Sequence, residues 1–233
     1  MATAQCEWGP NGVLAFRETA AVLVIVDVLS FSTAVDVAVA RGADVVPFPL
    51  GDREAAARAA AEAGALLAGV KRGGGYSLSP ASLREIPAGT RLLLPSPNGS
   101  RLSLLGGSAA VFAGCLRNAG AVAAAALQAA QGGDIAVIPA GERWRSDDSL
   151  RPAIEDWIGA GAILAALGLP LSPEARVARD AYLSAKATLA DTIRDSVSGR
   201  ELIDGGFAAD VELAVQQDVS SAAPRLRHGV YTA

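Results

Sequence analysis

The sequence predicts an α/β protein of three layers, in which helices cover both faces of a largely parallel sheet, with an antiparallel hairpin expected at one edge. Two observations predict this class. Short apolar runs alternate with helix-like segments along most of the chain, and the run at residues 20–26 (AAVLVIV) is typical of a strand buried on both faces. Repeated strand–helix units imply right-handed crossovers, and therefore parallel strands.

The elements are expected in order from the N-terminus. The segment up to Phe16, with a turn at residues 8–12 (WGPNG), is the candidate edge hairpin. The first central strand ends at Asp27. A helix is expected at residues 32–41, because the segment opens with a hydroxyl suited to capping and closes at Gly42.

The same alternation continues to the C-terminus, with a glycine-rich loop at residues 71–79. The further strands are expected at residues 45–48, 66–70, 91–94, 109–112 and 135–138. The further helices are expected at residues 52–63 and 118–131, after Pro152, from 173 to about 189, and at 208–217.

Length and composition limit the classes of function. A chain of 233 residues without an evident linker is expected to form one domain over residues 1–233. No apolar run approaches the roughly 20 residues that span a bilayer, and no basic, apolar leader is seen, so we expect a cytoplasmic protein without membrane contact. The net charge of -4, with scattered Lys and Arg, disfavours nucleic-acid binding.

The side chains available as ligands restrict any metal to oxygen donors. His228 is the single histidine and there are only two cysteines, which is too few for a zinc or iron site. Leu29 stands where a haloacid-dehalogenase-type phosphatase needs a second Asp, no Arg lies six residues after Cys115, and no P-loop is present. The remaining phosphatase chemistry is metal-assisted attack by water, with carboxylates as ligands and general base.

Asp27 is the first candidate for the centre of the site, because ligands of open parallel sheets bind outside the carboxyl ends of the strands. A carboxylate directly after a buried strand needs a cation or a hydrogen-bonding partner. Ser32 and Thr33 open the following helix, whose free amides suit an anion. Together these features suit a magnesium-dependent phosphoryl site. The alternative is structural: Asp27 caps a loop or helix, and the hydroxyls are ordinary N-caps.

Further polar candidates follow the later strands. The loop at residues 96–100 (SPNGS) offers Asn98 and backbone amides to an anion, although Pro-Asn-Gly is also an ordinary turn. Glu142 follows the last clear strand, and Glu155 and Asp156 lie on the next helix. Asp147 and Asp148 lie in the same loop as Glu142. Several of these carboxylates are expected to be solvated, and one or two of Glu142, Glu155 and Asp156 to converge on Asp27.

Several motifs in one order along the chain resemble a known family. They are VDVLSFST (26–33), ARGA (40–43), SPNGS (96–100), GCLRNA (114–119), PAGE (139–142), ED (155–156) with GAGA (159–162), and the part from SGREL (198–202) to residue 224. With these motifs the chain resembles the 2-phosphosulfolactate phosphatase family. The resemblance implies a three-layer α/β/α fold and magnesium-dependent hydrolysis of the phosphate ester of a sulfonated 2-hydroxy acid, a step in coenzyme M synthesis.

The resemblance, taken with residue chemistry, implies roles for matching positions. Asp27, Glu155 and Asp156 are expected to hold Mg²⁺, and Asp27 and Glu142 are the expected catalytic carboxylates. The residues expected to bind the small phosphorylated acid substrate are Ser32, Thr33, Asn98, Ser100 and Arg117.

The chain departs from the family pattern in two places. Ser30 stands where family members usually carry an Arg, and the segment at residues 69–80 is shortened. Losing an Arg removes a bidentate grip on an anion, for which Arg72, Arg117 or Arg143 would have to compensate. The departures keep two alternatives open: a phosphatase of another small phosphomonoester, and a non-catalytic anion-binding relative. A homodimer is expected on general frequency, with the small residues of segment 153–167 as one candidate surface.

Overall fold

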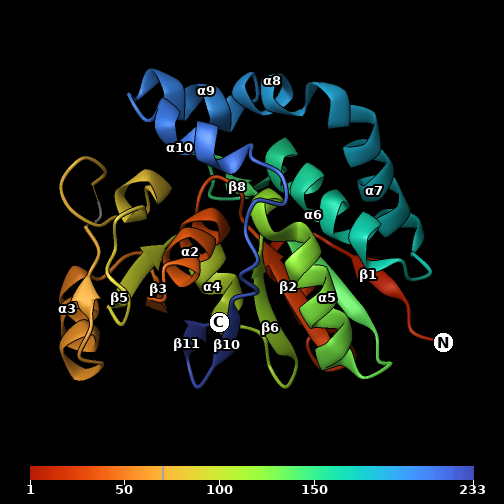
Figure 1. Cartoon of the computed structure of the whole chain (residues 1–233), viewed down its shortest axis with the longest axis horizontal. Helices are drawn as coiled ribbons and strands as arrows, with labels where there is room; N and C mark the ends of the chain where they lie inside the picture. Colours follow the sequence, from red (N-terminus) through yellow and green to blue (C-terminus); the bar gives the residue numbers. More distant parts are fainter. Residues whose placement is uncertain (70) are drawn as a thin grey trace.

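The structure is a computed structural model that describes residues 1–69 and 71–233. A sheet of nine described strands forms the middle layer, in the order β1-β7-β2-β6-β10-β11-β3-β5-β4, between helices on both faces (Figure 1). The strands are β1 (Ala4–Cys6), β2 (Val22–Val26), β3 (Asp44–Pro49), β4 (Leu66–Leu67), β5 (Arg91–Ser96), β6 (Ala110–Gly114), β7 (Ile135–Pro139), β10 (Arg225–Arg227) and β11 (Val230–Thr232). A separate ribbon pairs β8 (Glu142–Arg143) with β9 (Leu150–Arg151).

The sheet consists of two parallel blocks joined by a hairpin. Strands β1, β7, β2 and β6 form one parallel block, and β3, β5 and β4 form the other. The hairpin β10–β11 lies between them, antiparallel to β6 on one side and to β3 on the other. The predicted α/β class with a largely parallel sheet is confirmed.

The predicted N-terminal edge hairpin is wrong. β1 pairs in parallel with β7, and the residues expected to complete the hairpin form the helix α1 (Gly9–Phe16). Gly9 adopts a φ of 59° and Pro10 occupies the first turn of the helix, where proline is well tolerated. The Gly-Pro-Asn-Gly stretch therefore starts a helix, although the same residues are typical of a turn.

The helices cover the two faces of the sheet. They are α2 (Phe31–Ala40), α3 (Arg53–Glu62), α4 (Gly99–Leu104), α5 (Ala119–Ala130), α6 (Ile154–Leu167), α7 (Pro173–Ala185), α8 (Leu189–Arg194), α9 (Val197–Asp204) and α10 (Ala208–Ala214), with short turns of 3-10 helix at η1 (Pro80–Leu83), η2 (Leu116–Asn118) and η3 (Lys186–Thr188). Val24 of β2 packs in a core with α5, α6 and α7, while Ile25 packs in the core of the opposite face with α2 and α4. β2 is therefore buried on both faces, as predicted.

The C-terminal helices lie across one end of the sheet. Figure 1 shows α8, α9 and α10 as a layer above the region of β8, which follows directly after the carboxyl end of β7 in the chain. α10 also packs against η1, so this layer contacts the segment that follows the glycine-rich loop. The sequence predicts α10 but not α8 and α9, and it misses the hairpin β10–β11.

Element boundaries differ from the expected ones in two places. α2 begins at Phe31, one residue earlier than predicted, so Ser32 lies inside the helix and is not its N-cap. The strand expected at residues 66–70 is β4 (Leu66–Leu67), and Val70 lies outside the described residues. In the described part of the chain no helix has the length and apolarity needed to cross a membrane.

The small residues of α6 pack within the chain. A Cβ added at Gly161 would lie 2.1 Å from the carbonyl oxygen of Ala178 in α7, and one at Gly159 would lie 2.7 Å from the Val28 side chain. The expectation that these residues offer a surface to a second subunit is therefore wrong, because they allow close approach of α7 and of the β2 loop.

Candidate active site

The structure brings four carboxylates and an amide to the carboxyl end of the sheet. Asp27 follows β2, Asn98 follows β5, and Glu142 follows β7, while Glu155 and Asp156 lie in the first turn of α6. Asp27, Glu155 and Asp156 are only 5%, 2% and 3% exposed. Because isolated buried charges are very costly, such a group requires hydrogen-bond donors, protons or a cation.

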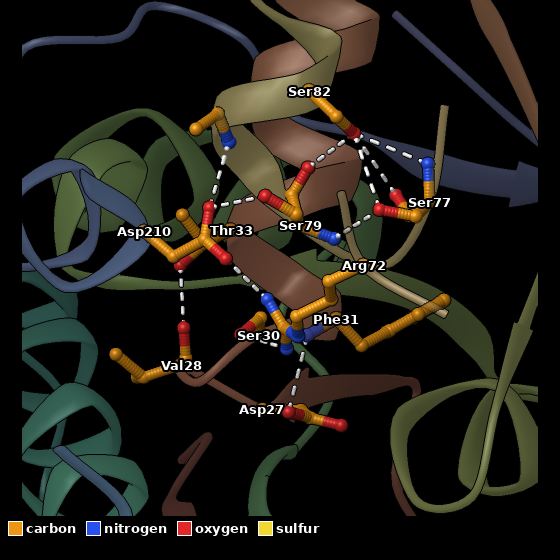
Figure 2. Close-up of polar contacts among 11 residues, drawn as sticks. Asp27, Val28, Ser30, Phe31, Thr33, Arg72, Ser77, Ser79, Ser82 and Asp210 are labelled. Atoms are coloured by element: carbon orange, nitrogen blue, oxygen red, sulfur yellow. Dashed lines mark hydrogen bonds and ion pairs between the residues drawn. The ribbon is translucent and has the colours of Figure 1, made fainter. Parts of the chain in front are cut away.

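Asp27 binds the first amides of two helices. Its Oδ2 accepts a hydrogen bond from the backbone N–H of Gly99 at 2.8 Å. Its Oδ1 accepts one from the backbone N–H of Phe31 at 3.2 Å (Figure 2). The capping role considered as an alternative is therefore present. These two hydrogen bonds do not offset the cost of burial. Burial raises the pKa of Asp27 to about 6, and the charge of Glu155 also raises it, while the two amides and the charge of Arg72 lower it.

The close approach of α4 to Asp27 depends on Gly99. A Cβ at this position would lie 2.2 Å from Cδ1 of the Phe31 ring. The loop after β5 is thus more than an ordinary turn, because it delivers one amide to Asp27 and a side chain to Glu142. Nδ2 of Asn98 donates to Oε2 of Glu142 at 2.9 Å.

Glu142 combines burial with an acidic environment. Burial raises the pKa of Glu142 to about 7, and Asp27 and Glu155 raise it further, while the hydrogen bond from Asn98 and the charge of Arg151 lower it. Glu142 and Asn98 also line a cavity of about 180 Å³ beside α1. Asp27 is not on the wall of this cavity, so Glu142 is the carboxylate that connects the buried group to it.

Asp156 fastens the loops that carry the other carboxylates. Its Oδ1 accepts a hydrogen bond from Val28 N at 2.7 Å and its Oδ2 accepts one from Gly141 N at 2.9 Å. Burial raises the pKa of Asp156 well above its usual range, and the charges of Asp27 and Glu155 raise it further. The neighbouring Glu155 differs, because among the described residues no group donates a hydrogen bond to its side chain.

Ser32, Thr33 and Ser100 are fully buried, and their hydroxyls bind the backbone. Oγ of Ser32 donates to Ile25 O and accepts from Asp27 N, both at 3.0 Å. Oγ1 of Thr33 donates to Val28 O at 2.7 Å, and Oγ of Ser100 donates to Leu94 O at 2.9 Å. In this structure the three hydroxyls shape the loops that present Asp27. Direct contact with a phosphate stays a prediction that would require these bonds to be exchanged.

Arg117 points to a different part of the molecule. Its Nε donates to Oδ2 of Asp36 in α2 at 2.8 Å, and its other donors reach Leu213 O at 3.4 Å and the side chain of Gln216. Through Arg117, these hydrogen bonds attach the C-terminal end of α10 and the segment after it to α2. The structure therefore commits Arg117 to contacts away from the carboxylates, and the predicted role in substrate binding gains no support.

Arg72 is the cation that reaches the position of Ser30. Its Nη2 donates to Ser30 Oγ at 2.9 Å, and its Nη1 is paired with Asp210 of α10 (Figure 2). Of the three arginines considered as compensation, Arg72 is the one whose charge lowers the pKa of Asp27. Arg143 is paired with Asp148 at 2.9 Å, and Arg117 with Asp36.

Sequence reasoning missed Arg151 entirely. Arg151 stands directly opposite Glu142 in the β8–β9 ribbon, and its side chain is 12% exposed. The available signal was its place before Pro152 and the helix that carries Glu155, because proline holds the preceding residue in an extended conformation.

The carboxylate oxygens of the site are ligands that suit a hard cation, provided that the cation takes few of its ligands from the protein. Within the described ranges no three Asp, Glu, His or Cys side chains form a ready-made metal site. Mg²⁺, however, usually takes one or two carboxylates and completes its shell with waters and substrate phosphates. Burial, and to a smaller extent repulsion between the carboxylates, raises the pKa of Asp27, Glu142 and Asp156, so the ionised form of the group lacks compensating positive charge. A divalent cation would supply that charge.

Fold and site together define an α/β enzyme with a carboxylate centre at the carboxyl end of its parallel strands. A model of the family described as 2-phosphosulpholactate phosphatase matches residues 12–229. The chain belongs to this family, and the resemblance seen in the motifs is confirmed.

Three relatives carry the same description. A 2-phosphosulfolactate phosphatase of Methanothermobacter thermautotrophicus is 30% identical over 216 residues, covering 91% of this chain and 89% of the relative. A probable 2-phosphosulfolactate phosphatase of Carboxydothermus hydrogenoformans is 31% identical over 214 residues, covering 87% and 84%. Another from Pseudothermotoga lettingae is 27% identical over 209 residues, covering 87% and 88%. Family and relatives together support a phosphatase enzyme.

Proposed function

We propose that the protein is a magnesium-dependent phosphatase that hydrolyses 2-phosphosulfolactate, or a similar small phosphorylated 2-hydroxy acid, to release phosphate. The observation that carries this proposal is the convergence of Asp27, Glu142, Glu155 and Asp156 at one end of the sheet. The names of the relatives support the substrate class.

Asp27 and Glu155 are the side chains best suited to hold Mg²⁺. Glu155 is almost fully buried and has no described hydrogen-bond donor, and Asp27 stays short of compensating charge despite its two amides. Both oxygens of Asp156 already accept a hydrogen bond from a backbone amide. Asp156 could therefore bind the cation only through the remaining lone pair of each oxygen. A bound Mg²⁺ would supply positive charge that polarises the phosphate and offsets the carboxylates.

Glu142 is suited to move the proton. A pKa of about 7 is close to a working pH, which favours general acid–base catalysis. Asn98 holds Oε2, which leaves Oε1 to accept a proton from the attacking water. The water oxygen forms a bond to phosphorus, the ester P–O bond breaks, and the departing oxygen takes up a proton to give the 2-hydroxy acid and inorganic phosphate.

Phosphate release by the purified chain tests the proposal. We expect release from 2-phosphosulfolactate in Mg²⁺, its loss in EDTA, and slower release from phosphomonoesters that lack a second acidic group. Undiminished release in EDTA would overturn the metal requirement, and a preference for simple esters would favour a phosphatase of another substrate. If the protein releases phosphate from none of these esters but still binds anions, it would be a non-catalytic relative.

We further place this activity in the cytoplasm and, following the family resemblance, in coenzyme M synthesis. Cys6 and Cys115 are both buried and unpaired, as is usual in reducing compartments. Immunodetection after cell fractionation tests the location, and recovery of the protein outside the cytoplasm would contradict it. Accumulation of 2-phosphosulfolactate in a strain that lacks the protein tests the pathway.

A further inference from the structure

Two nearly buried arginines, Arg72 and Arg151, lie beside the carboxylate group. Their side chains are 16% and 12% exposed. They come from segments far apart in the sequence, one from the glycine-rich loop and one from β9. Both are held by the C-terminal helices. Because a buried guanidinium is costly without partners, the contacts of each indicate what it is positioned for.

Arg72 is fixed from behind by Asp210, whose carboxylate is 1% exposed. Oδ1 of Asp210 also accepts hydrogen bonds from the Ser79 hydroxyl and from Ala81 N, the latter at 3.0 Å, so its position is well determined. Figure 2 shows the guanidinium of Arg72 between Asp210 and Ser30. The hydrogen bond from Arg72 to Ser30, three residues after Asp27, places this cation on the Asp27 side of the group, and its charge lowers the pKa of Asp27.

Arg151 is held on the Glu142 side. It is the cross-strand partner of Glu142, and directly opposed residues lie close together on one face of a ribbon. Within the described residues it nevertheless pairs with the carboxylate of Glu201, at 3.8 Å, and not with Glu142. Its Nη2 also donates to Ser198 Oγ at 3.3 Å. A guanidinium has five N–H donors, so, counting partners in the described part of the chain, most of those of Arg151 are available to a ligand.

These two cations match the charges of the substrate class. As its name states, 2-phosphosulfolactate carries a phosphate, a carboxylate and a sulfonate. The cation proposed at Asp27 and Glu155 offsets charge only near the phosphate. An acidic group elsewhere on the molecule, bound beside this carboxylate group, needs a cation of its own. The planar fork of Arg suits bidentate contacts with such tetrahedral or planar anions.

We propose that Arg72 and Arg151 form a two-point anion clamp, in which Arg72 binds the phosphate and Arg151 binds an acidic group that is not transferred. This inference rests on the proposed function and assigns specificity to Arg151. The clamp also gives the C-terminal layer a role, because α10 positions Arg72 through Asp210 and α9 positions Arg151 through Ser198.

The test compares substrates with and without a second acidic group. In Arg151→Gln we expect KM for 2-phosphosulfolactate to rise by about ten- to one-hundred-fold, as for a lost charge-assisted hydrogen bond, and KM for p-nitrophenyl phosphate to stay at its wild-type value. Because the charge of Arg151 lowers the pKa of Glu142, a change in kcat is expected for both substrates and does not bear on the clamp. Arg72→Gln should lower kcat/KM for both substrates. Arg151→Lys keeps the charge without the fork and should give an intermediate KM. Arg58→Gln, with a side chain 66% exposed on α3, is the matched control and should change neither substrate.

The outcomes that overturn the clamp are distinct from those that overturn the proposed function. An equal rise in KM for both substrates in Arg151→Gln, with circular dichroism and thermal melting unchanged, overturns the clamp. If the wild-type protein hydrolyses no ester, the proposed function fails, and calorimetry with sulfolactate and inorganic phosphate tests the clamp alone. The clamp then requires sulfolactate binding to weaken in Arg151→Gln and phosphate binding to weaken in Arg72→Gln. Equal binding by all variants, or none by the wild type, overturns it.

Discussion

At the scale of single residues, Asp27 combines two tasks that are usually treated as alternatives. It caps two helices through Gly99 and Phe31, and it remains short of compensating charge because burial dominates its surroundings. A strand-end carboxylate can therefore organise the loops of a site and still offer its charge to a cation. The hydroxyls of Ser32 and Thr33 support it from within the structure, through contacts to the backbone of the same loop.

Replacing Asp27 by Asn tests this dual role. We expect Asp27→Asn to lower magnesium-dependent phosphate release by at least about one-hundred-fold, because a neutral amide binds the cation much more weakly than a carboxylate. The fold should survive with reduced stability, since the amide oxygen still accepts one of the two backbone hydrogen bonds while Nδ2 cannot accept the other. Phosphate release measured with a thermal melt on the same sample checks both parts. Retained turnover would remove Asp27 from the mechanism.

Glu142 makes the stability of the metal-free protein depend on pH. Its pKa is raised from 4.5 to about 7, so the folded state holds a proton that the unfolded state releases above pH 4.5. The folded protein therefore loses stability as pH rises from about 4.5 to 7. The full effect is on the order of 3 kcal/mol and is smaller in practice because Glu142 is half-buried.

Urea unfolding in EDTA at pH 5 and pH 8 checks this prediction. Glu142→Gln should raise the free energy of unfolding relative to wild type at pH 8 and change it little at pH 5. The matched control is Glu62→Gln, an exposed carboxylate of α3. The same difference between Glu142→Gln and wild type at both pH values would show that Glu142 ionises normally.

At the scale of elements, the start of α4 is the feature most sensitive to a small change. In Gly99→Ala the added methyl would lie 2.2 Å from the Phe31 ring. α2 and α4 would have to separate, and the amide of residue 99 would move from Asp27. We expect a loss of about 1–3 kcal/mol of stability.

Thermal unfolding and phosphate release of Gly99→Ala should fall together. Gly74→Ala is the control, because a Cβ at Gly74 meets no atom within 4 Å. Wild-type activity in Gly99→Ala would mean that the contact between α4 and Asp27 is dispensable.

At the scale of the whole molecule, the hairpin β10–β11 joins the two parallel blocks of the sheet. Tyr231 of β11 is fully buried between them, its ring packs edge-on to Phe31, and its hydroxyl donates to Ser103 Oγ at 2.7 Å. The last residues of the chain thus complete the centre of the sheet instead of extending its edge.

Removing the Tyr231 side chain should destabilise the whole fold. We expect Tyr231→Ala to cost about 3–5 kcal/mol, as for other large buried aromatic residues, and Tyr231→Phe about 1 kcal/mol for the lost hydrogen bond. Urea unfolding followed by circular dichroism measures both. A loss below 1 kcal/mol in Tyr231→Ala would indicate that the two blocks hold together without the hairpin.

The sequence by itself determined the α/β class, the central strands, and the family, because buried strands and motif order are local patterns. It also identified Asp27, Asn98, Glu142, Glu155 and Asp156 as candidates, since each stands at the end of a strand or the start of a helix. Only the tertiary structure decided which candidates meet. Arg117 is held by Asp36, and Arg72 and Arg151 are brought to the carboxylates by helices that follow much later in the chain. The physical reason is that hydrophobic periodicity reports local burial, whereas charge pairing depends on long-range contacts that no short window of sequence contains.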